Sequence, residues 1–82
     1  MNGNGDYKIK VLAIYKYLLD TDREHPITLP DVRDRIEKEY NIAADIRTIC
    51  NDLNVIQIVD SRLQKERGCR GRYNRYWLEQ EV

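Results

Sequence analysis

The stretch ADIRTICNDL, residues 44–53, predicts a helix with one apolar and one polar side. Asp45 is a favourable N-cap, because its carboxylate can accept a hydrogen bond from the free N–H groups of the first turn. Isoleucine or leucine then recurs every three or four residues, at Ile46, Ile49, Leu53 and Ile56. The opposite side carries the polar residues Arg47, Asn51 and Asn54. Thr48 and Cys50 lie at the margins of this side. We therefore expect a helix that packs through its isoleucines and turns a polar face to solvent.

A first helix is predicted upstream, beginning at Tyr7. Its expected buried side is the one on which apolar residues gather at a 3.6-residue period: Tyr7, Val11, Leu12, Ile14, Tyr15, Leu18 and Leu19. The side expected to face solvent holds the remaining residues: Lys10, Ala13, Lys16 and Asp20. Residues 1–6 are polar and show no period, so we expect a flexible tail there.

A second helix is predicted with recognisable signals at both ends. Thr28 is a good N-cap, and Asp31 three residues later completes a variant of the capping box. Pro30 falls in the first turn, where its missing N–H costs nothing. Asn41 favours the left-handed conformation that ends a helix, and Ile42 is expected to plug the turn that follows. The expected buried stripe consists of Leu29, Val32, Ile36 and Tyr40.

A β-hairpin is predicted after the third helix. The segments QIVDSRLQ, residues 57–64, and NRYWLEQ, residues 74–80, are rich in β-branched, aromatic and alternating residues. They flank KERGCRGRY, residues 65–73, whose glycines permit a turn. Ile27 can add a very short strand. These elements predict a mainly helical fold with a small hairpin, a winged helix-turn-helix of three helices and a two- or three-stranded sheet, in one domain spanning residues 7–82.

The overall composition excludes several classes of protein. Lys plus Arg and Asp plus Glu both number 14, so the net charge of zero points to no partner by itself. Two cysteines are too few for a small disulfide scaffold, and no apolar run approaches the roughly 20 residues that span a bilayer. We expect a reduced, cytoplasmic protein without membrane contact. The lone His25 has no neighbouring nucleophile, and one histidine with two cysteines makes no zinc pattern, so neither an enzyme nor a metal or cofactor site is expected.

The hairpin region concentrates positive charge. Six cations lie within fourteen residues against the single acid Glu66: Arg62, Lys65, Arg67, Arg70, Arg72 and Arg75. Such groups bind phosphates and supply affinity without sequence information. Aromatic residues are interleaved with them. We expect Tyr76, Trp77 and Leu78 to belong to the core rather than to a stacking surface. Strand alternation sets Tyr76 and Leu78 on one face and Trp77 on the other, so the alternative is that one aromatic ring is left for a partner.

The polar face of the third helix is suited to reading bases. Arg47 can bind guanine and Asn51 adenine with two hydrogen bonds each. Asn54 can reach the backbone, and Thr48 lies beside them. The candidate nucleic-acid-binding residues are therefore these four together with the six hairpin cations.

Residues 8–79 resemble the N-terminal winged-helix domain of the DeoR-like, WYL-type bacterial transcription regulators. The similar segments are KIKVLAIYKYLLDTD, EHPITLPDVRDRIEKEYNI and RTICNDL, the last matching an R-T-I-x-R-D-L motif. The resemblance implies a domain that binds operator DNA as a dimer, here without the effector-sensing WYL domain. Asn51 stands where the family usually has arginine, Cys50 where an aromatic residue is common, and the glycine that usually closes the helix is missing.

Two functional hypotheses follow. The first is a small transcriptional regulator, such as a repressor from a bacterium or a phage, that binds double-stranded DNA. The second is a module that binds a host protein or a ribonucleoprotein, for example a phage inhibitor of the anti-CRISPR type. A homodimer is also expected, because Ile9 and Tyr17 lie off the main apolar arc of the first helix and can meet across a two-fold axis.

Overall fold

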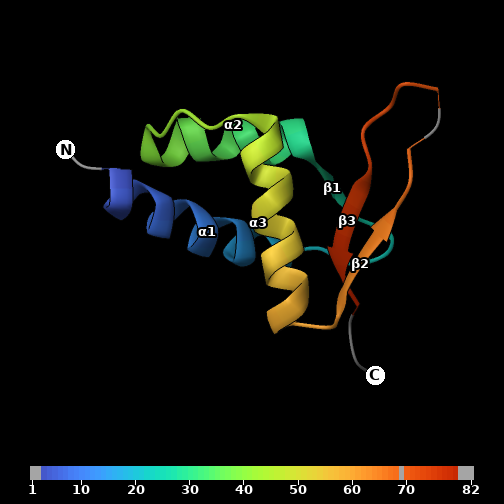
Figure 1. Ribbon diagram of the computed structural model, residues 1–82. Helices are drawn as coiled ribbons and strands as arrows, with labels where there is room; N and C mark the ends of the chain where they lie inside the picture. The colour runs from blue at the N-terminus through green and yellow to red at the C-terminus, as the bar shows by residue number, and fades with distance from the viewer. Residues whose placement is uncertain (1–2, 69, 80–82) are drawn as a thin grey trace.

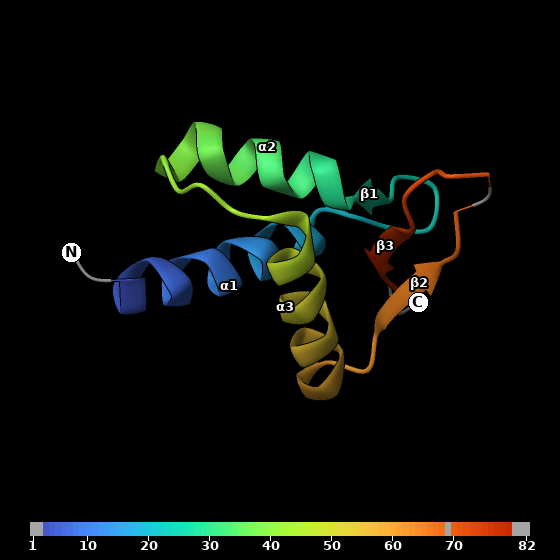
Figure 2. The same cartoon turned by 45° about the horizontal axis from the view of Figure 1, so that its top comes forward.

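The computed structural model describes residues 3–68 and 70–79, which form three helices and three strands (Figure 1). In chain order these are α1 (Gly3–Leu19), β1 (Ile27–Thr28), α2 (Leu29–Tyr40), α3 (Ile46–Val59), β2 (Leu63–Glu66) and β3 (Arg75–Leu78). Helices α1 and α2 lie one above the other, α3 crosses them, and the β2–β3 hairpin projects beyond α3 (Figures 1 and 2). The predicted mainly helical class with a small sheet is confirmed.

β3, the last strand along the chain, lies in the middle of the three-stranded sheet. The strand order is β1-β3-β2, and both pairings are antiparallel. Ile27 lies opposite Tyr76, so the predicted short strand exists and joins the start of α2 to the hairpin. Trp77 is only 8% exposed in this middle strand, and its Nε1 donates a hydrogen bond to Glu79 Oε2 at 2.9 Å. The expectation that Tyr76, Trp77 and Leu78 are core residues is therefore confirmed, and the alternative that one ring is left for a partner is wrong, because residues on both faces of the middle strand are covered.

Both predicted ends of α2 are confirmed. The Thr28 hydroxyl accepts a hydrogen bond from the Asp31 N–H, and the Asp31 carboxylate accepts one from the Thr28 N–H, which is a complete capping box. Asn41 has φ 55° and ψ 38°, the left-handed conformation that stops the helix. Leu29, Val32 and Ile36 are buried as predicted. Tyr40 is 37% exposed, because it occupies the last position of the helix, beyond the edge of the core.

Helix α3 has the predicted face and a later end. The Asp45 carboxylate accepts a hydrogen bond from the Arg47 N–H at 2.9 Å, and Ile49, Leu53 and Ile56 are buried while Ile46 is half-buried. The helix continues to Val59, so the strand predicted from residue 57 is wrong and β2 begins only at Leu63. β-branched residues favour strands only weakly, and the packing of the preceding turns carries the helix through them. The predicted end of the second strand, at residue 80, lies outside the described residues.

Helix α1 buries a side that only partly matches the predicted one: Ile14 and Leu18 are buried as predicted, but Lys10 and Ala13, predicted to face solvent, are buried as well. It begins at Gly3, because the apolar period marks where burial starts and not where the helix starts. The described residues of its buried side are Lys10, Ala13, Ile14, Tyr17 and Leu18, whereas Tyr7, Leu12 and Leu19 are at least half exposed. Two polar partners explain the rotation. Lys10 Nζ lies 3.1 Å from Asp52 Oδ2, and the Tyr17 hydroxyl donates to Glu39 Oε1 at 2.8 Å.

The core lies where the three helices meet the sheet. Its most deeply buried side chains come from every layer: Ile14, Tyr17, Leu18, Val32, Ile36, Ile49, Leu53 and Leu78. The guanidinium carbon of Arg35, on α2, lies 4.4 Å from the centre of the Tyr17 ring. This cation therefore covers the edge of the core. Because Tyr17 is only 1% exposed, the predicted dimer contact through Tyr17 is wrong.

Candidate nucleic-acid interface

The first half of α3 presents a polar stripe to solvent. Arg47, Asn51 and Asn54 are all exposed, as the sequence predicts. Among the described residues, no carboxylate pairs with the Arg47 side chain. Thr48 is half-buried, and its hydroxyl donates to the Asp45 carbonyl at 2.8 Å, so this group belongs to the first turn of the helix. The stripe therefore offers one guanidinium and two amides to a partner.

The other side of the same helix is structural. Asp52 is 2% exposed and forms the buried ion pair with Lys10 of α1. Ile49 and Leu53 of the same helix belong to the hydrophobic core. Three of the residues in the RTICNDL stretch thus hold α3 against the rest of the molecule, and they orient its polar stripe outward.

The hairpin loop is held closed by a backbone-to-side-chain hydrogen bond and by close backbone packing. The Gly68 N–H donates to Asn74 Oδ1 at 3.0 Å across the loop. A Cβ atom on Gly68 would lie 2.3 Å from the Arg72 carbonyl oxygen, so only glycine allows the two sides to come this close. Arg70 and Gly71 both have positive φ, at 53° and 81°, and they turn the chain at the tip. The loop is therefore shaped by its own sequence.

Two of the six predicted hairpin cations are already paired. Arg62 donates to both carboxylate oxygens of Asp60, with its Nη2 2.7 Å from Oδ2, and also to the Tyr15 hydroxyl at 3.2 Å. These hydrogen bonds, from Arg62 first and then Tyr15, hold the pKa of Asp60 well below its usual range. Arg75 pairs with Glu66, the residue directly opposite on β2. Arg62 thus fastens the end of α3 to α1, away from the hairpin tip.

Four cations remain for a partner. Lys65, Arg67, Arg70 and Arg72 are exposed, and the described part of the chain places no carboxylate against them. They lie around the end of the hairpin, next to the exposed ring of Tyr73. Cations that carry no internal ion pair are free to exchange counterions for phosphate groups. Of the six predicted hairpin cations, four are therefore available to a partner.

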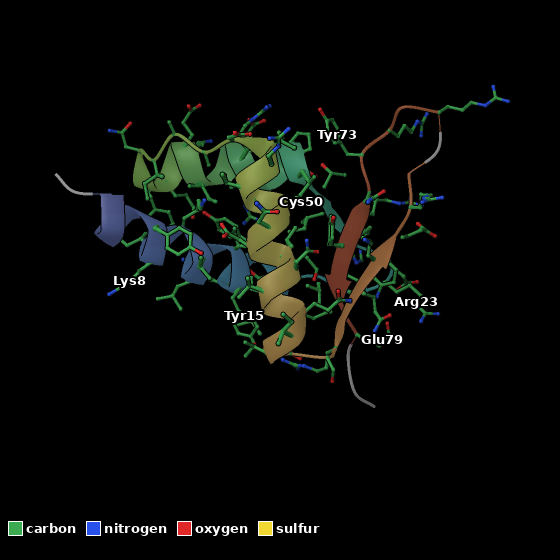
Figure 3. The ribbon with its side chains drawn as sticks, viewed as in Figure 1. Lys8, Tyr15, Arg23, Cys50, Tyr73 and Glu79 are labelled. Carbon is green, nitrogen blue, oxygen red and sulfur yellow. The ribbon has the colours of Figure 1, made fainter. Side chains whose placement is uncertain are left out.

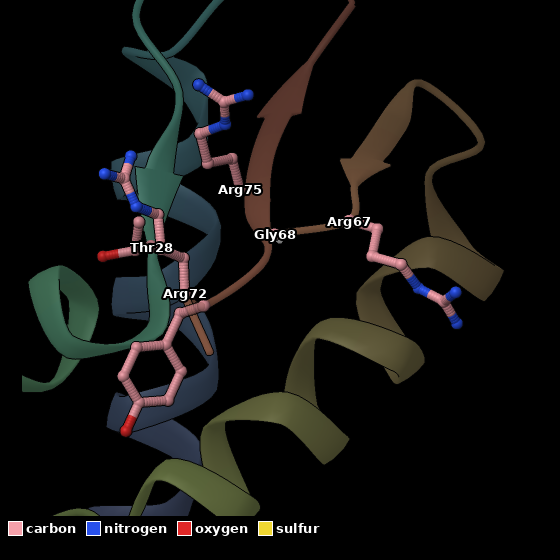
Figure 4. A pocket seen from close by; sticks show the side chains of 6 residues that line it. Thr28, Arg67, Gly68, Arg72 and Arg75 are labelled. Atoms are coloured by element: carbon pink, nitrogen blue, oxygen red, sulfur yellow. The ribbon is translucent and has the colours of Figure 1, made fainter. Parts of the chain in front are cut away.

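A pocket of about 380 Å³ separates the hairpin from the start of α2 (Figure 4). The guanidinium groups of Arg72 and Arg75 lie on the same side of the hairpin as Thr28, whereas Arg67 points to the opposite side (Figure 4). Tyr73 completes the wall. Sequence reasoning did not include Thr28 here, because only the pairing of β1 with β3 brings the start of α2 beside the loop. The hairpin therefore presents positive charge in two directions.

Cys50 lies in the second turn of α3, and its thiol is close to the Tyr76 hydroxyl of β3 (Figure 3). It is half-buried and packs against the core. Burial first, and then the nearby Cys50 thiol, raise the pKa of the Tyr76 hydroxyl against the opposing effect of Asn74. The thiol thus lies beneath the hairpin and not on the exposed stripe.

Within residues 3–68 and 70–79, no group of three or more His, Cys, Asp or Glu side chains is placed to hold a metal ion. No helix in that part of the chain is long and apolar enough to cross a membrane. Comparisons with protein families, with curated proteins and with solved structures give no match to this chain.

Proposed function

We propose that this chain is a winged helix-turn-helix protein that binds double-stranded DNA and acts as a small transcriptional regulator. The observation that carries the proposal is the combination of two surfaces. One is the exposed stripe of Arg47, Asn51 and Asn54 on α3, and the other is the set of unpaired cations on the hairpin. The resemblance of the RTICNDL stretch to bacterial regulators supports the same conclusion.

The two surfaces lie in a favourable arrangement. The hairpin lies on the sheet side of α3, and its tip reaches about the level of the first turn of that helix (Figure 1). A helix fits the major groove of B-DNA, and a flanking loop then meets the phosphates at the groove edge. In this arrangement α3 would insert its first half, and Lys65, Arg67, Arg70 and Arg72 would contact the backbone.

The number of unpaired cations sets the expected salt dependence. Four phosphate contacts predict that log K falls with log salt at a slope of about −3.6, which is roughly a hundredfold loss of affinity between 50 and 200 mM salt. Six contacts would give a slope near −5.4. The measured slope therefore reports whether Arg62 and Arg75 keep their internal partners when DNA binds.

Fluorescence anisotropy with labelled random duplex tests the proposal. Arg67→Ala and Arg72→Ala should each weaken binding to every duplex and lower the slope by about one unit. Arg75→Ala should change it less, because its charge is already paired with Glu66. Lys16→Ala is the matched control, since this exposed cation lies on α1. Failure to bind any duplex at about 50 mM salt would contradict the proposal and favour a protein or ribonucleoprotein partner.

Sequence preference requires a second experiment. Selection from a random duplex library should return a preferred site. On that site Arg47→Ala and Asn51→Ala should each cost roughly 1 to 3 kcal/mol, with little effect on random DNA. A lost base contact removes discrimination, whereas a lost phosphate contact removes attraction. Equal losses on preferred and random duplex would show that the stripe does not read bases.

A further inference from the structure

The pocket between the hairpin and the start of α2 has the dimensions of a small-molecule site. Its volume of about 380 Å³ falls within the range of roughly 300 to 1,000 Å³ that is usual for such sites. Three of its six lining residues are arginines and none is an acid: Thr28, Arg67, Gly68, Arg72, Tyr73 and Arg75. This lining suits an anionic ligand.

Two of the arginines direct their charge to the same side of the hairpin. The guanidinium groups of Arg72 and Arg75 lie on the side that carries Thr28, whereas that of Arg67 points away (Figure 4). Arg75 is fixed in the middle strand, directly opposite Thr28 of β1. Each planar guanidinium can donate two parallel hydrogen bonds to the oxygens of a phosphate group. Two of them on one side of a pocket are therefore suited to a phosphate group.

Two carboxylates lie near these arginines. Glu66 is paired with Arg75, and the Asp31 carboxylate accepts a hydrogen bond from the Thr28 N–H. The pair with Glu66 engages Arg75 through Nη2, so other N–H groups of this guanidinium remain for a ligand. Arg72 is paired with no carboxylate of the described residues. We therefore expect Arg72 to be the principal phosphate ligand and Arg75 the second one.

Tyr73 adds an aromatic surface to the same pocket. Its side chain is 50% exposed, lines the pocket and follows Arg72 directly in the chain. Exposed aromatic rings stack on nucleobases of any kind, because every base has a flat π face. An aromatic ring beside two guanidinium groups can thus hold a base at one end of a ligand and a phosphate at the other.

The loop that carries Arg72 and Tyr73 is shaped before any ligand binds. The Gly68 N–H donates to Asn74 Oδ1 at 3.0 Å, and the Gly68 backbone is in close contact with the Arg72 carbonyl oxygen. The backbone on this side of the pocket is therefore restrained. Binding would have to order mainly side chains, which limits its cost in conformational entropy.

We propose that this pocket binds a nucleoside monophosphate, with the phosphate on the guanidinium groups of Arg72 and Arg75 and the base stacked on Tyr73. A terminal phosphate carries a charge of about −1.5 to −2 at neutral pH, which complements two guanidinium groups better than the single charge of a backbone phosphodiester. The inference goes beyond the proposed function, because the nucleotide site exists whether or not the chain binds duplex DNA.

A nuclear magnetic resonance titration of the full chain with adenosine monophosphate (AMP) tests the proposal. We expect saturable shifts at the amide signals of Thr28, Arg72 and Tyr73, with a dissociation constant below about 1 mM. Adenosine lacks the phosphate and ribose 5-phosphate lacks the base, so each should bind about tenfold more weakly than AMP. The dinucleotide ApA, whose phosphate is a diester, should also bind more weakly, which separates a free nucleotide from a strand.

Variants assign the two halves of the ligand. Arg72→Ala should weaken AMP binding about tenfold or more, and Tyr73→Ala should do the same, whereas Tyr73→Phe keeps the ring and should bind like the native chain. Glu66→Gln should strengthen AMP binding, because it frees the Arg75 guanidinium, and a merely structural role of these residues predicts no gain. Lys38→Ala is the matched control, since this exposed cation lies at the opposite end of α2. All of these side chains are exposed, and circular dichroism checks that each variant folds.

Four results would overturn the proposal. They are the absence of saturable shifts at roughly 5 mM AMP, equal affinity for AMP and inorganic sulfate, which would indicate an adventitious ion only, equal affinity for AMP and ApA, and an Arg72→Ala effect no larger than that of Lys38→Ala. The titration contains no duplex, so its result is separate from the proposed function. Duplex binding without AMP binding would leave that function standing, whereas AMP binding without duplex binding would leave only the pocket.

Discussion

The buried ion pair between α1 and α3 yields the sharpest test of the fold. Lys10 Nζ lies 3.1 Å from Asp52 Oδ2, and the two side chains are only 9% and 3% exposed. Asp52→Asn leaves the ammonium group of Lys10 in the interior without a countercharge. Removing one partner of a buried pair costs about 3 to 5 kcal/mol, because the remaining charge keeps its desolvation penalty. The expected stability of an 82-residue domain is only about 4 to 12 kcal/mol, so this variant should be close to unfolding.

Removing both charges should be much less harmful. In Lys10→Met/Asp52→Leu no charge is buried, and replacement of such pairs by apolar residues is often neutral or stabilising. Urea unfolding followed by circular dichroism of the native chain, Lys10→Met, Asp52→Leu and the double variant gives the coupling energy between the two positions. If the effects of the single changes simply add in the double variant, or if Asp52→Asn costs less than about 1 kcal/mol, the two groups do not form a buried pair and the orientation of α1 is wrong.

Further predictions concern packing, pH and the hairpin. Leu53→Ala should cost about 2 to 5 kcal/mol, since Leu53 is 1% exposed, whereas Val55→Ala should cost far less, since Val55 lies on another side of the same helix and is 48% exposed; equal melting temperatures would refute the buried face of α3. The pKa of Asp60 is lowered in the folded chain, so its stabilisation is complete above the unfolded value of about 4 and is lost as pH falls below it. Arg62→Met should therefore reduce the acid sensitivity of unfolding, and parallel acid curves would contradict this role. Gly68→Ala should open the hairpin and weaken duplex binding while the helical circular dichroism signal is unchanged, because the added Cβ would collide with the Arg72 carbonyl oxygen. Native-like duplex binding by this variant would show that the close contact between Gly68 and Arg72 is not needed for binding.

The features that the sequence predicts correctly depend on short-range signals. The capping box of α2 needs only Thr28 and Asp31, three residues apart, and the end of the helix needs only Asn41. The buried face of α3 follows from the regular spacing of the large aliphatic residues Ile49, Leu53 and Ile56. In each case the residues that decide the structure are close in sequence.

The features that could not be predicted from the sequence depend on residues that are far apart in the chain. Lys10 is buried only because Asp52 arrives from α3, and no pattern within α1 reveals this. Likewise, β-branched residues around Ile58 favour a strand locally, but packing of the earlier turns continues the helix. The number of hairpin cations could be counted from the sequence. That Arg62 is bound to Asp60 and Tyr15, and so does not belong to the cations available to a partner, is visible only in the folded structure.

The position of β3 in the middle of the sheet has a consequence for synthesis of the chain. β1 precedes α2, yet its partner is the last strand, with Ile27 opposite Tyr76. During translation, the three helices can therefore emerge and begin to collapse while the edges of β1 and β2 have no neighbour. The sheet can close only after Leu78 has left the ribosome, so a stalled chain would expose unpaired strand edges and the apolar side chains that β3 covers.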